Sequence, residues 1–117
     1  INKKKTQWIL NKLSKELKKI NKNKIKIICM GLSYKPDVGD MRESPSLEIY
    51  QALTKNKKFL TYAHDPHIKD KKLFIKNNLK DIKDFDVYIK LVEHKIFDKK
   101  PYKNLFKKNK LIDLTKS

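Results

Sequence analysis

The amino-acid sequence predicts a three-layer α/β domain with a small, mostly parallel sheet, preceded by an N-terminal helix. Two observations support this prediction. Short, β-branched apolar runs alternate along the 117 residues with segments of helical periodicity, which is typical of crossovers that place helices on both faces of a sheet. The first of these runs is nearly all apolar, as expected for a strand buried on both faces. A chain of this length forms at most one domain.

The first twenty-odd residues are predicted to form a helix that stops at residues 21–23. Its apolar residues recur at spacings of three and four, which places them on one helical face: Leu10, Leu13, Leu17 and Ile20. We expect this stripe to pack on other domains and to be exposed in this chain, where it would favour a homodimer. Trp8 is expected at an interface or in the core.

A strand, a loop and a helix are predicted next. Residues 25–30 form the buried strand, and residues 33–43 form a polar loop in which proline and glycine exclude regular structure. Ser44 is expected to cap the following helix, with Pro45 at its first position, where the missing N–H costs nothing.

The rest of the chain continues the alternation. Strands are predicted at residues 59–62, 87–92 and 111–114. Residues 68–85 are expected to form one or two short helices, and residues 101–107 one short helix.

The chain is strongly basic, with 30 Lys and Arg against 13 Asp and Glu and a formal net charge of +17. Such an excess is the electrostatic footprint of proteins that bind nucleic acid or anionic lipid. Only one of the 30 basic residues is an arginine, Arg42, and the lysines are scattered along the chain. Because nucleic-acid readers usually add arginine for bidentate contacts, we favour a compositional bias and keep a small basic nucleic-acid-binding module as the alternative.

Several classes of protein and site are excluded or disfavoured. The single cysteine, Cys29, excludes a disulfide scaffold and a multi-cysteine metal site, and it is expected in the core. His64, His67 and His94 are expected at the surface rather than on a metal. The chain contains no apolar run of 18 residues and no signal peptide, so a cytoplasmic protein is expected. It starts at Ile1 rather than Met, which suggests a piece of something longer.

The strand–loop–helix unit resembles a dinucleotide-binding start only superficially. A G-x-G-x-x-G turn lets the backbone touch a pyrophosphate, but this chain has only two glycines, Gly31 and Gly39, eight residues apart. The usual backbone contact with a dinucleotide is therefore excluded at this turn, and the loop is expected to project side chains instead.

That loop is the most informative part of the sequence. Residues 31–45, here called the signature loop, read Gly-Leu-Ser-Tyr-Lys-Pro-Asp-Val-Gly-Asp-Met-Arg-Glu-Ser-Pro. They resemble the stretch G-(L/F)-(A/S)-(F/Y)-K-x-(D/N)-x-x-D-x-R-E-S-(P/S) in the C-terminal domain of the UDP-glucose/GDP-mannose dehydrogenase family. Residues 62–66, 86–94 and 111–113 resemble further family segments in the same order. The resemblance covers essentially the whole chain, but only the last third of a full-length member.

The resemblance implies a Rossmann-like fold and a role in a larger enzyme. Residues 1–22 would be a helical linker to upstream domains, and residues 23–117 the UDP-binding domain. Members of the family oxidise the C6 alcohol of a nucleotide sugar to a uronic acid for polysaccharide synthesis, with two NAD and a cysteine-bound intermediate. The hydride chemistry and the nucleophile belong to upstream domains, so this chain alone is not expected to catalyse. The particular residues of the signature loop favour the branch of the family that acts on UDP-N-acetylhexosamines.

Individual roles follow from the resemblance. Tyr34 and Lys35 match the aromatic–lysine pair that contacts the nucleotide sugar, and Arg42 matches the arginine that reaches NAD across the domain interface. No metal is implied. Lys35 supplies a point charge for phosphate, and Arg42 a planar fork for bidentate contacts. The helix that starts after Ser44 favours a nearby anion at its N-terminus.

Some positions point to structure or to a departure from the family. Asp40 and Glu43 are expected to organise the loop as hydrogen-bond acceptors, with Arg42 as one partner when no cofactor is bound. The family often has an arginine where this chain has Thr115, so either Lys116 replaces that contact or the contact is missing. A scaffold that folds and binds nothing is a third reading of the chain.

Overall fold

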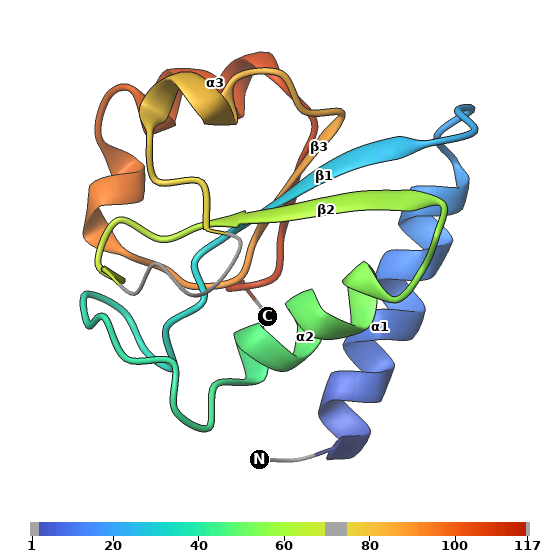
Figure 1. Cartoon of the computed structure of the whole chain (residues 1–117), viewed down its shortest axis with the longest axis horizontal. Coiled ribbons are helices and arrows are strands. Elements are labelled where there is room, and N and C mark those ends of the chain that lie inside the picture. Colours follow the sequence, from blue (N-terminus) through green and yellow to red (C-terminus); the bar gives the residue numbers. More distant parts are fainter. Residues whose placement is uncertain (1–2, 70–74, 117) are drawn as a thin grey trace.

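The computed structural model describes residues 3–69 and 75–116 (Figure 1). Its helices and strands follow in this order: α1 Lys3–Lys18, β1 Ile25–Met30, α2 Pro45–Thr54, β2 Phe59–His64, the 3₁₀ helix η1 Leu79–Ile82, β3 Val87–Lys90, the 3₁₀ helix η2 Lys95–Asp98, α3 Tyr102–Lys108 and β4 Leu111–Asp113. The predicted alternation of strands and helices is therefore confirmed.

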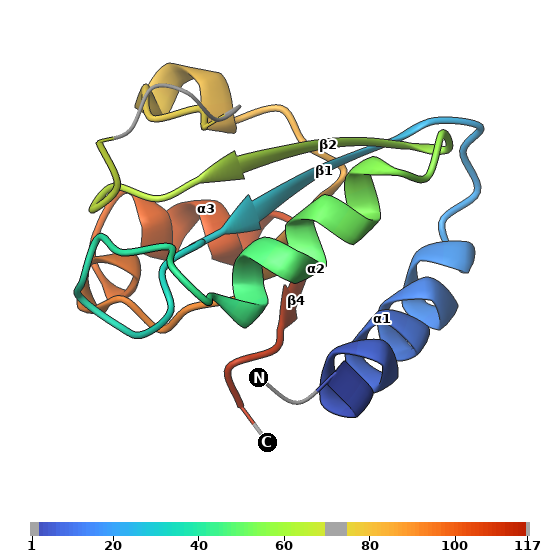
Figure 2. The same cartoon turned by 60° about the horizontal axis from the view of Figure 1, so that its bottom comes forward.

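The sheet has four parallel strands in the order β2-β1-β3-β4. Helices α1 and α2 lie on one face and α3 on the other, so the predicted three-layer α/β architecture is confirmed (Figure 2). The chain passes from β1 through α2 to β2 on one side, and then returns to place β3 on the other side of β1. In parallel sheets, ligands bind outside the carboxyl ends of the strands at such a reversal.

The strands bury both faces because alternate residues enter two different cores. Ile27 and Cys29 face α1 and α2, whereas Ile28 and Met30 face η1, η2 and α3. All four side chains are fully buried, which confirms that Cys29 is a core residue.

Helix α1 is part of this core. Leu13 and Leu17 are 0% and 1% exposed and pack with the residues of α2 and the sheet. The expectation that the apolar stripe of this helix is exposed is therefore wrong, because the sheet face beside α2 covers it. Trp8 lies off the stripe and is 62% exposed. No helix among the described residues is both long and apolar enough to cross a membrane.

The strand ends differ slightly from the prediction, and the pairing explains why. Strand β2 continues to His64 because it stays paired with β1 as far as Met30. Strand β3 ends at Lys90, two residues early, because its partner also ends at Met30. There Gly31 turns the chain away with a φ of 101°, a conformation that suits glycine. Strand β4 ends at Asp113, where its partner β3 ends.

The segment between β2 and β3 was predicted to hold one or two short helices. Its described residues contain one, η1, and an isolated parallel bridge joins Ile75 to Ala63. Residues 70–74 lie outside the described part of the chain. Helix α3 begins and ends one residue later than predicted, and η2 was not predicted.

Candidate functional site

A cavity of about 350 Å³ lies at the carboxyl edge of the sheet, at the point where the strand order reverses. Its wall is formed by α1, the signature loop, the start of α2 and the segments that follow β3 and β4. The side chains of interest are Tyr34 and Lys35 from the signature loop, Ser46 from α2, Glu93 after β3 and Thr115 after β4. This is where the topology of an open parallel sheet places a ligand.

The N-terminus of α2 opens onto the cavity. Ser44 caps the helix as predicted, because its Oγ accepts from the N–H of Leu47 at 3.3 Å. The same hydroxyl donates to the carbonyl of Leu32 at 2.7 Å, which joins the helix start to the end of β1. Pro45 and Ser46, in the first turn, line the cavity. Because Pro45 has no N–H and the cap takes up the N–H of Leu47, the turn offers an anion the N–H of Ser46 and the helix dipole.

Tyr34 and Lys35 both line the cavity, as side chains projected from the loop. The N–H of Tyr34 donates to the carbonyl of Asp40 at 2.9 Å, which closes the loop on itself. The Lys35 Nζ lies 5.4 Å from the centroid of the Tyr34 ring, within cation–π range. Thr115 reaches the same cavity, and its hydroxyl donates to the Asp113 carboxylate.

Arg42 does not line this cavity. It borders a more open hollow of about 490 Å³, together with Tyr34, Asp40 and Glu43. Its Nη2 lies 2.8 Å from the Asp40 carboxylate, and its Nε donates to the same group, so the expected pairing of Asp40 with Arg42 is confirmed. These hydrogen bonds lower the pKa of Asp40 to about 2. The Arg42 side chain is nevertheless 89% exposed.

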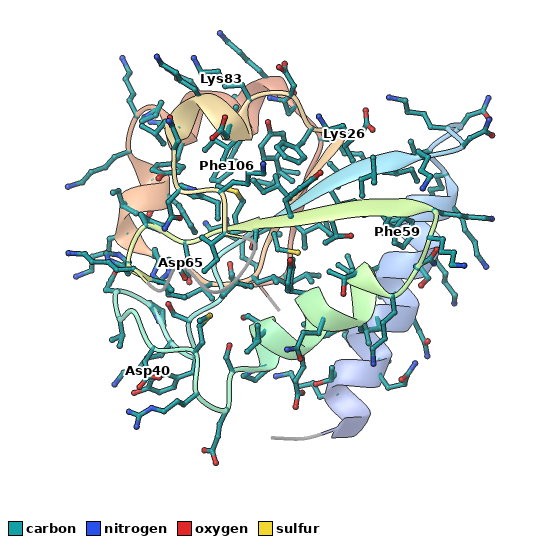
Figure 3. The ribbon with its side chains drawn as sticks, in the orientation of Figure 1. Lys26, Asp40, Phe59, Asp65, Lys83 and Phe106 are labelled. Carbon is teal, nitrogen blue, oxygen red and sulfur yellow. The ribbon has the colours of Figure 1, made fainter. Side chains whose placement is uncertain are left out.

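A buried carboxylate, Asp65, ties together the ends of three neighbouring strands, β2, β1 and β3, beside the signature loop (Figure 3). Its Oδ2 accepts from the N–H of Leu32 at 2.8 Å, from the N–H and Oγ of Ser33 at 3.1 and 2.8 Å, and from Nε2 of His94 at 3.0 Å. Its Oδ1 accepts from the N–H of His67 at 2.9 Å. One side chain after β2 therefore holds the segments that follow β1 and β3.

His94 extends this network to the far side of the signature loop. Its Nδ1 accepts from the backbone N–H of Asp37 at 2.8 Å, so the ring proton must sit on Nε2, which donates to Asp65. The Asp37 carboxylate in turn accepts from the N–H of Lys95 at 2.8 Å. Both ring nitrogens of His94 are thus committed to holding loops in place.

The expectation of surface histidines is wrong. His94 is 0% and His64 1% exposed, and His67 is partly buried. The Nδ1 of His64 lies 2.6 Å from the carbonyl of Lys76, and its Nε2 lies 2.6 Å from the hydroxyl of Tyr102. The rings are buried because they lie where neighbouring parallel strands end, at one edge of the sheet. There the imidazole nitrogens form hydrogen bonds with backbone and hydroxyl groups of the loops.

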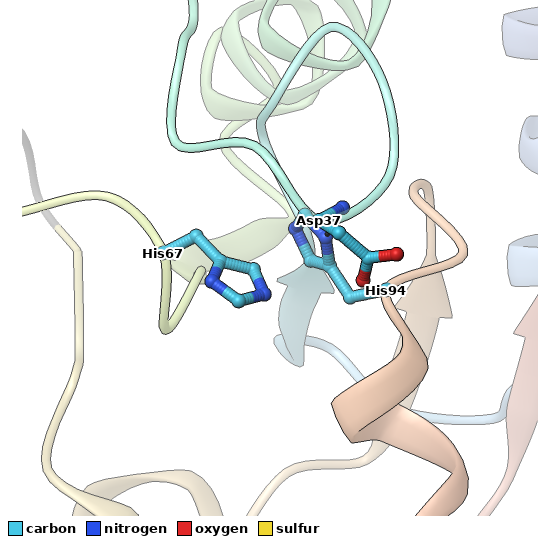
Figure 4. A group of neighbouring side chains, drawn as sticks. All are labelled: Asp37, His67 and His94. Atoms are coloured by element: carbon cyan, nitrogen blue, oxygen red, sulfur yellow. Dashed lines mark hydrogen bonds between the residues drawn. The ribbon is translucent and has the colours of Figure 1, made fainter.

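Asp37, His67 and His94 bring one potential metal-ligating atom each within 4.8 Å of one another (Figure 4). Since both nitrogens of His94 already have partners, a metal ion would have to displace either the Asp37 N–H or Asp65. The arrangement is therefore a hydrogen-bond junction rather than a ready set of ligands.

Gly39 closes the signature loop against the turn that follows β2. A Cβ at this position would overlap the backbone carbonyl oxygen of His67. Because the obstacle is backbone, only glycine fits the observed approach. Neither this contact nor the role of His94 was predicted from the sequence; the available signal was that Asp65 and His94 each follow a strand of the same parallel sheet.

Acid should weaken the fold through Asp65. Burial alone raises the pKa of this carboxyl, but hydrogen bonds from His94, Leu32 and Ser33 outweigh burial and lower the pKa to about 2. Because an unfolded aspartate has a pKa of about 3.9, this carboxylate stabilises the fold fully above about pH 4, and about 2 kcal/mol is lost as the pH falls toward 2.

The measurement is urea unfolding of the wild type and Asp65→Asn between pH 6 and pH 2. The gap between the two unfolding free energies should shrink in acid, since only the wild type has this carboxyl to protonate. Asp40 and Asp86, whose pKa values are also lowered, are present in both proteins, so their contributions to the difference in unfolding free energy cancel. A gap that stays constant across the range would contradict the prediction.

Comparison with known proteins places this geometry in context. Residues 28–116 match the family model of the UDP-glucose/GDP-mannose dehydrogenase family, UDP binding domain. The UDP-N-acetyl-D-mannosamine dehydrogenase of Campylobacter jejuni is 34% identical over 105 residues, which cover 83% of this chain and 25% of that protein. The enzyme of the same name from Methanococcus vannielii is 35% identical over 122 aligned positions, covering 100% and 28%.

A solved structure agrees with these relatives. The UDP-N-acetyl-mannosamine dehydrogenase from Staphylococcus aureus superposes with a TM-score of 0.78 at 27% identity, over 95% of this chain and 27% of that chain. The chain therefore spans about a quarter of the length of the relatives that it matches.

Proposed function

Because the chain belongs to the UDP-glucose/GDP-mannose dehydrogenase family and corresponds to its UDP-binding domain, we propose that the cavity at the carboxyl edge of the sheet holds the nucleotide part of a UDP-sugar. The observation that carries this proposal is the meeting of Tyr34 and Lys35 with the N-terminus of α2 around one cavity. A cation and a helix N-terminus together suit a diphosphate. Tyr34 offers an aromatic face to the nucleoside.

The proposed reaction of the whole protein is the NAD-dependent oxidation of the C6 alcohol of a UDP-N-acetylhexosamine to the uronic acid, a precursor for polysaccharides. Two relatives carry the name UDP-N-acetyl-D-mannosamine dehydrogenase, which favours this class of sugar. In this proposal residues 1–22 lead from the catalytic domains into the UDP-binding domain, residues 23–117, and the enzyme works in the cytoplasm. The homodimer expected from an exposed α1 stripe loses its basis, because Leu13 and Leu17 are buried.

Cys29 does not fit the role of the family's nucleophile. It is fully buried in β1, and burial raises its pKa to about 12. A thiol with so little thiolate and no access to solvent is unreactive. The covalent step therefore belongs outside this domain.

NAD would meet this chain through one side chain. The chain has no glycine-rich turn to hold a pyrophosphate by its backbone, whereas Arg42 is exposed and presents a planar guanidinium. We propose that Arg42 exchanges part of its contact with Asp40 for a phosphate oxygen of NAD bound mainly by another domain. When bound, NAD supplies the hydride acceptor; Arg42 contributes orientation and charge.

Removing the Lys35 charge should weaken UDP binding. Loss of one charge-assisted hydrogen bond predicts a dissociation constant about 10 to 100 times higher in Lys35→Ala. The measurement is calorimetric titration of this chain with UDP. Lys83→Ala is the matched control, because it removes an equal charge beside η1, on the face that α3 covers.

Three outcomes are distinct. Weakened binding in Lys35→Ala with normal binding in Lys83→Ala supports the site. Equal binding by both variants and the wild type places UDP elsewhere. A wild-type chain that binds no UDP leaves only the scaffold reading.

A further inference from the structure

The part of the signature loop that carries Tyr34 and Lys35 is pinned at both ends. At its start, the N–H groups of Leu32 and Ser33 donate to Asp65. At its end, the N–H of Asp37 donates to Nδ1 of His94. The residues between these anchors line the cavity, so the anchors set the position of the backbone from which Lys35 extends.

The anchor at Asp37 has to hold an unfavourable backbone. Asp37 has a φ of 62°, in the left-handed region that residues other than glycine adopt at a cost. Two hydrogen bonds keep it there: its N–H donates to His94, and its carboxylate accepts from the N–H of Lys95, both at 2.8 Å. Without the first bond, the chain gains freedom to leave this conformation.

His94 is built to keep its ring in one orientation. Its Nε2 donates to Asp65 at 3.0 Å, and its ring packs edge to face against His67 and Phe97, with centroids 4.5 and 5.3 Å away. The side chain is fully buried. The His94 ring is therefore held in one rotamer, in which Nδ1 faces the N–H of Asp37 as an acceptor.

We propose that His94 is a positioning residue for nucleotide binding: Asp65 orients its ring, its Nδ1 holds Asp37, and the loop held in this way presents Lys35 to the diphosphate. This inference rests on the proposed function of the cavity. It adds a residue that touches no ligand and acts through the loop backbone.

The two nitrogens of His94 can be tested one at a time. The amide oxygen of asparagine can occupy the place of Nδ1, so His94→Asn keeps an acceptor for Asp37 and loses the donor to Asp65. The amide nitrogen of glutamine can reach the place of Nε2, so His94→Gln keeps the donor to Asp65 and loses the acceptor for Asp37. Both variants lose the same ring, which makes them matched controls for each other.

UDP affinity should separate the two variants even where stability does not. We expect the dissociation constant for UDP to rise about tenfold in His94→Gln and to stay within about threefold of wild type in His94→Asn. Tyr102→Phe is the control for lost stability, since it removes the hydroxyl bound to His64, outside the signature loop. Its affinity should stay within about threefold of wild type.

Amide hydrogen exchange measures directly whether the N–H of Asp37 is still hydrogen-bonded. The Asp37 N–H should be protected in the wild type and in His94→Asn and should exchange rapidly in His94→Gln. The proposal is overturned if affinity falls alike in His94→Asn, His94→Gln and Tyr102→Phe, or if Asp37 stays protected in His94→Gln. If the wild-type chain binds no UDP, the proposed function fails, whereas the exchange pattern still tests the anchor.

Discussion

Replacing Asp65 by alanine should lower the free energy of unfolding by about 3–5 kcal/mol, because it orphans a set of buried donors at once. These donors are the N–H groups of Leu32, Ser33 and His67, the Ser33 hydroxyl and His94 Nε2. None of them gains a new partner from a methyl group. Urea denaturation at neutral pH, followed by circular dichroism, measures the loss.

The control for Asp65 is a carboxylate at the opposite end of the sheet. Asp86 accepts from the N–H of Lys26 at 2.8 Å and from Lys22 Nζ at 2.7 Å, but its side chain is 23% exposed. Asp86→Ala should cost about 1 kcal/mol, because water can replace the lost partner. Equal losses in the two variants would contradict the central role of Asp65. If Asp65→Ala does not fold, Asp65→Asn, which keeps one acceptor, provides the comparison.

The second large effect is expected in helix α1. Leu13→Ala should lower the free energy of unfolding by about 2–5 kcal/mol, since this fully buried side chain leaves a cavity between α1, α2 and the sheet. Trp8→Ala, on the exposed side of the same helix, should change the unfolding free energy by less than about 0.5 kcal/mol.

The two helix variants are compared by urea unfolding, with the slope of the transition recorded as well as its midpoint. A single transition in Leu13→Ala, shifted to lower urea, shows that α1 unfolds together with the sheet. An unshifted midpoint, or a first transition that involves only the helix, would show that α1 is independent of the domain.

Local patterns in the sequence predicted most of the fold. The β-branched run from Ile25 to Met30 and the Ser44–Pro45 start were placed correctly, because burial on both faces and helix capping leave short-range marks. The ends of β2 and β3 were not, because each strand stops where its neighbour stops, and the neighbour is distant in sequence. For α1, the periodicity indicated which face of the helix is apolar. It could not indicate that α2 and the sheet cover that face.

The candidate site divides in the same way. The signature loop predicted Tyr34, Lys35 and Arg42 as residues of interest, and their roles stay predictions. The anchor behind the loop was missed, because nothing next to His94 in the sequence indicates that its ring is buried. Its partner Asp65 lies 29 residues away and meets it only through the packing of parallel strands.

The union of α1 with the sheet also bears on the cavity. Leu13 and Leu17 hold the second half of the helix in the core, and residues near its start form part of the same cavity wall as Lys35. The helix and the signature loop therefore belong to one packed unit, and a change that loosens α1 also disturbs the cavity wall that it shares with Lys35.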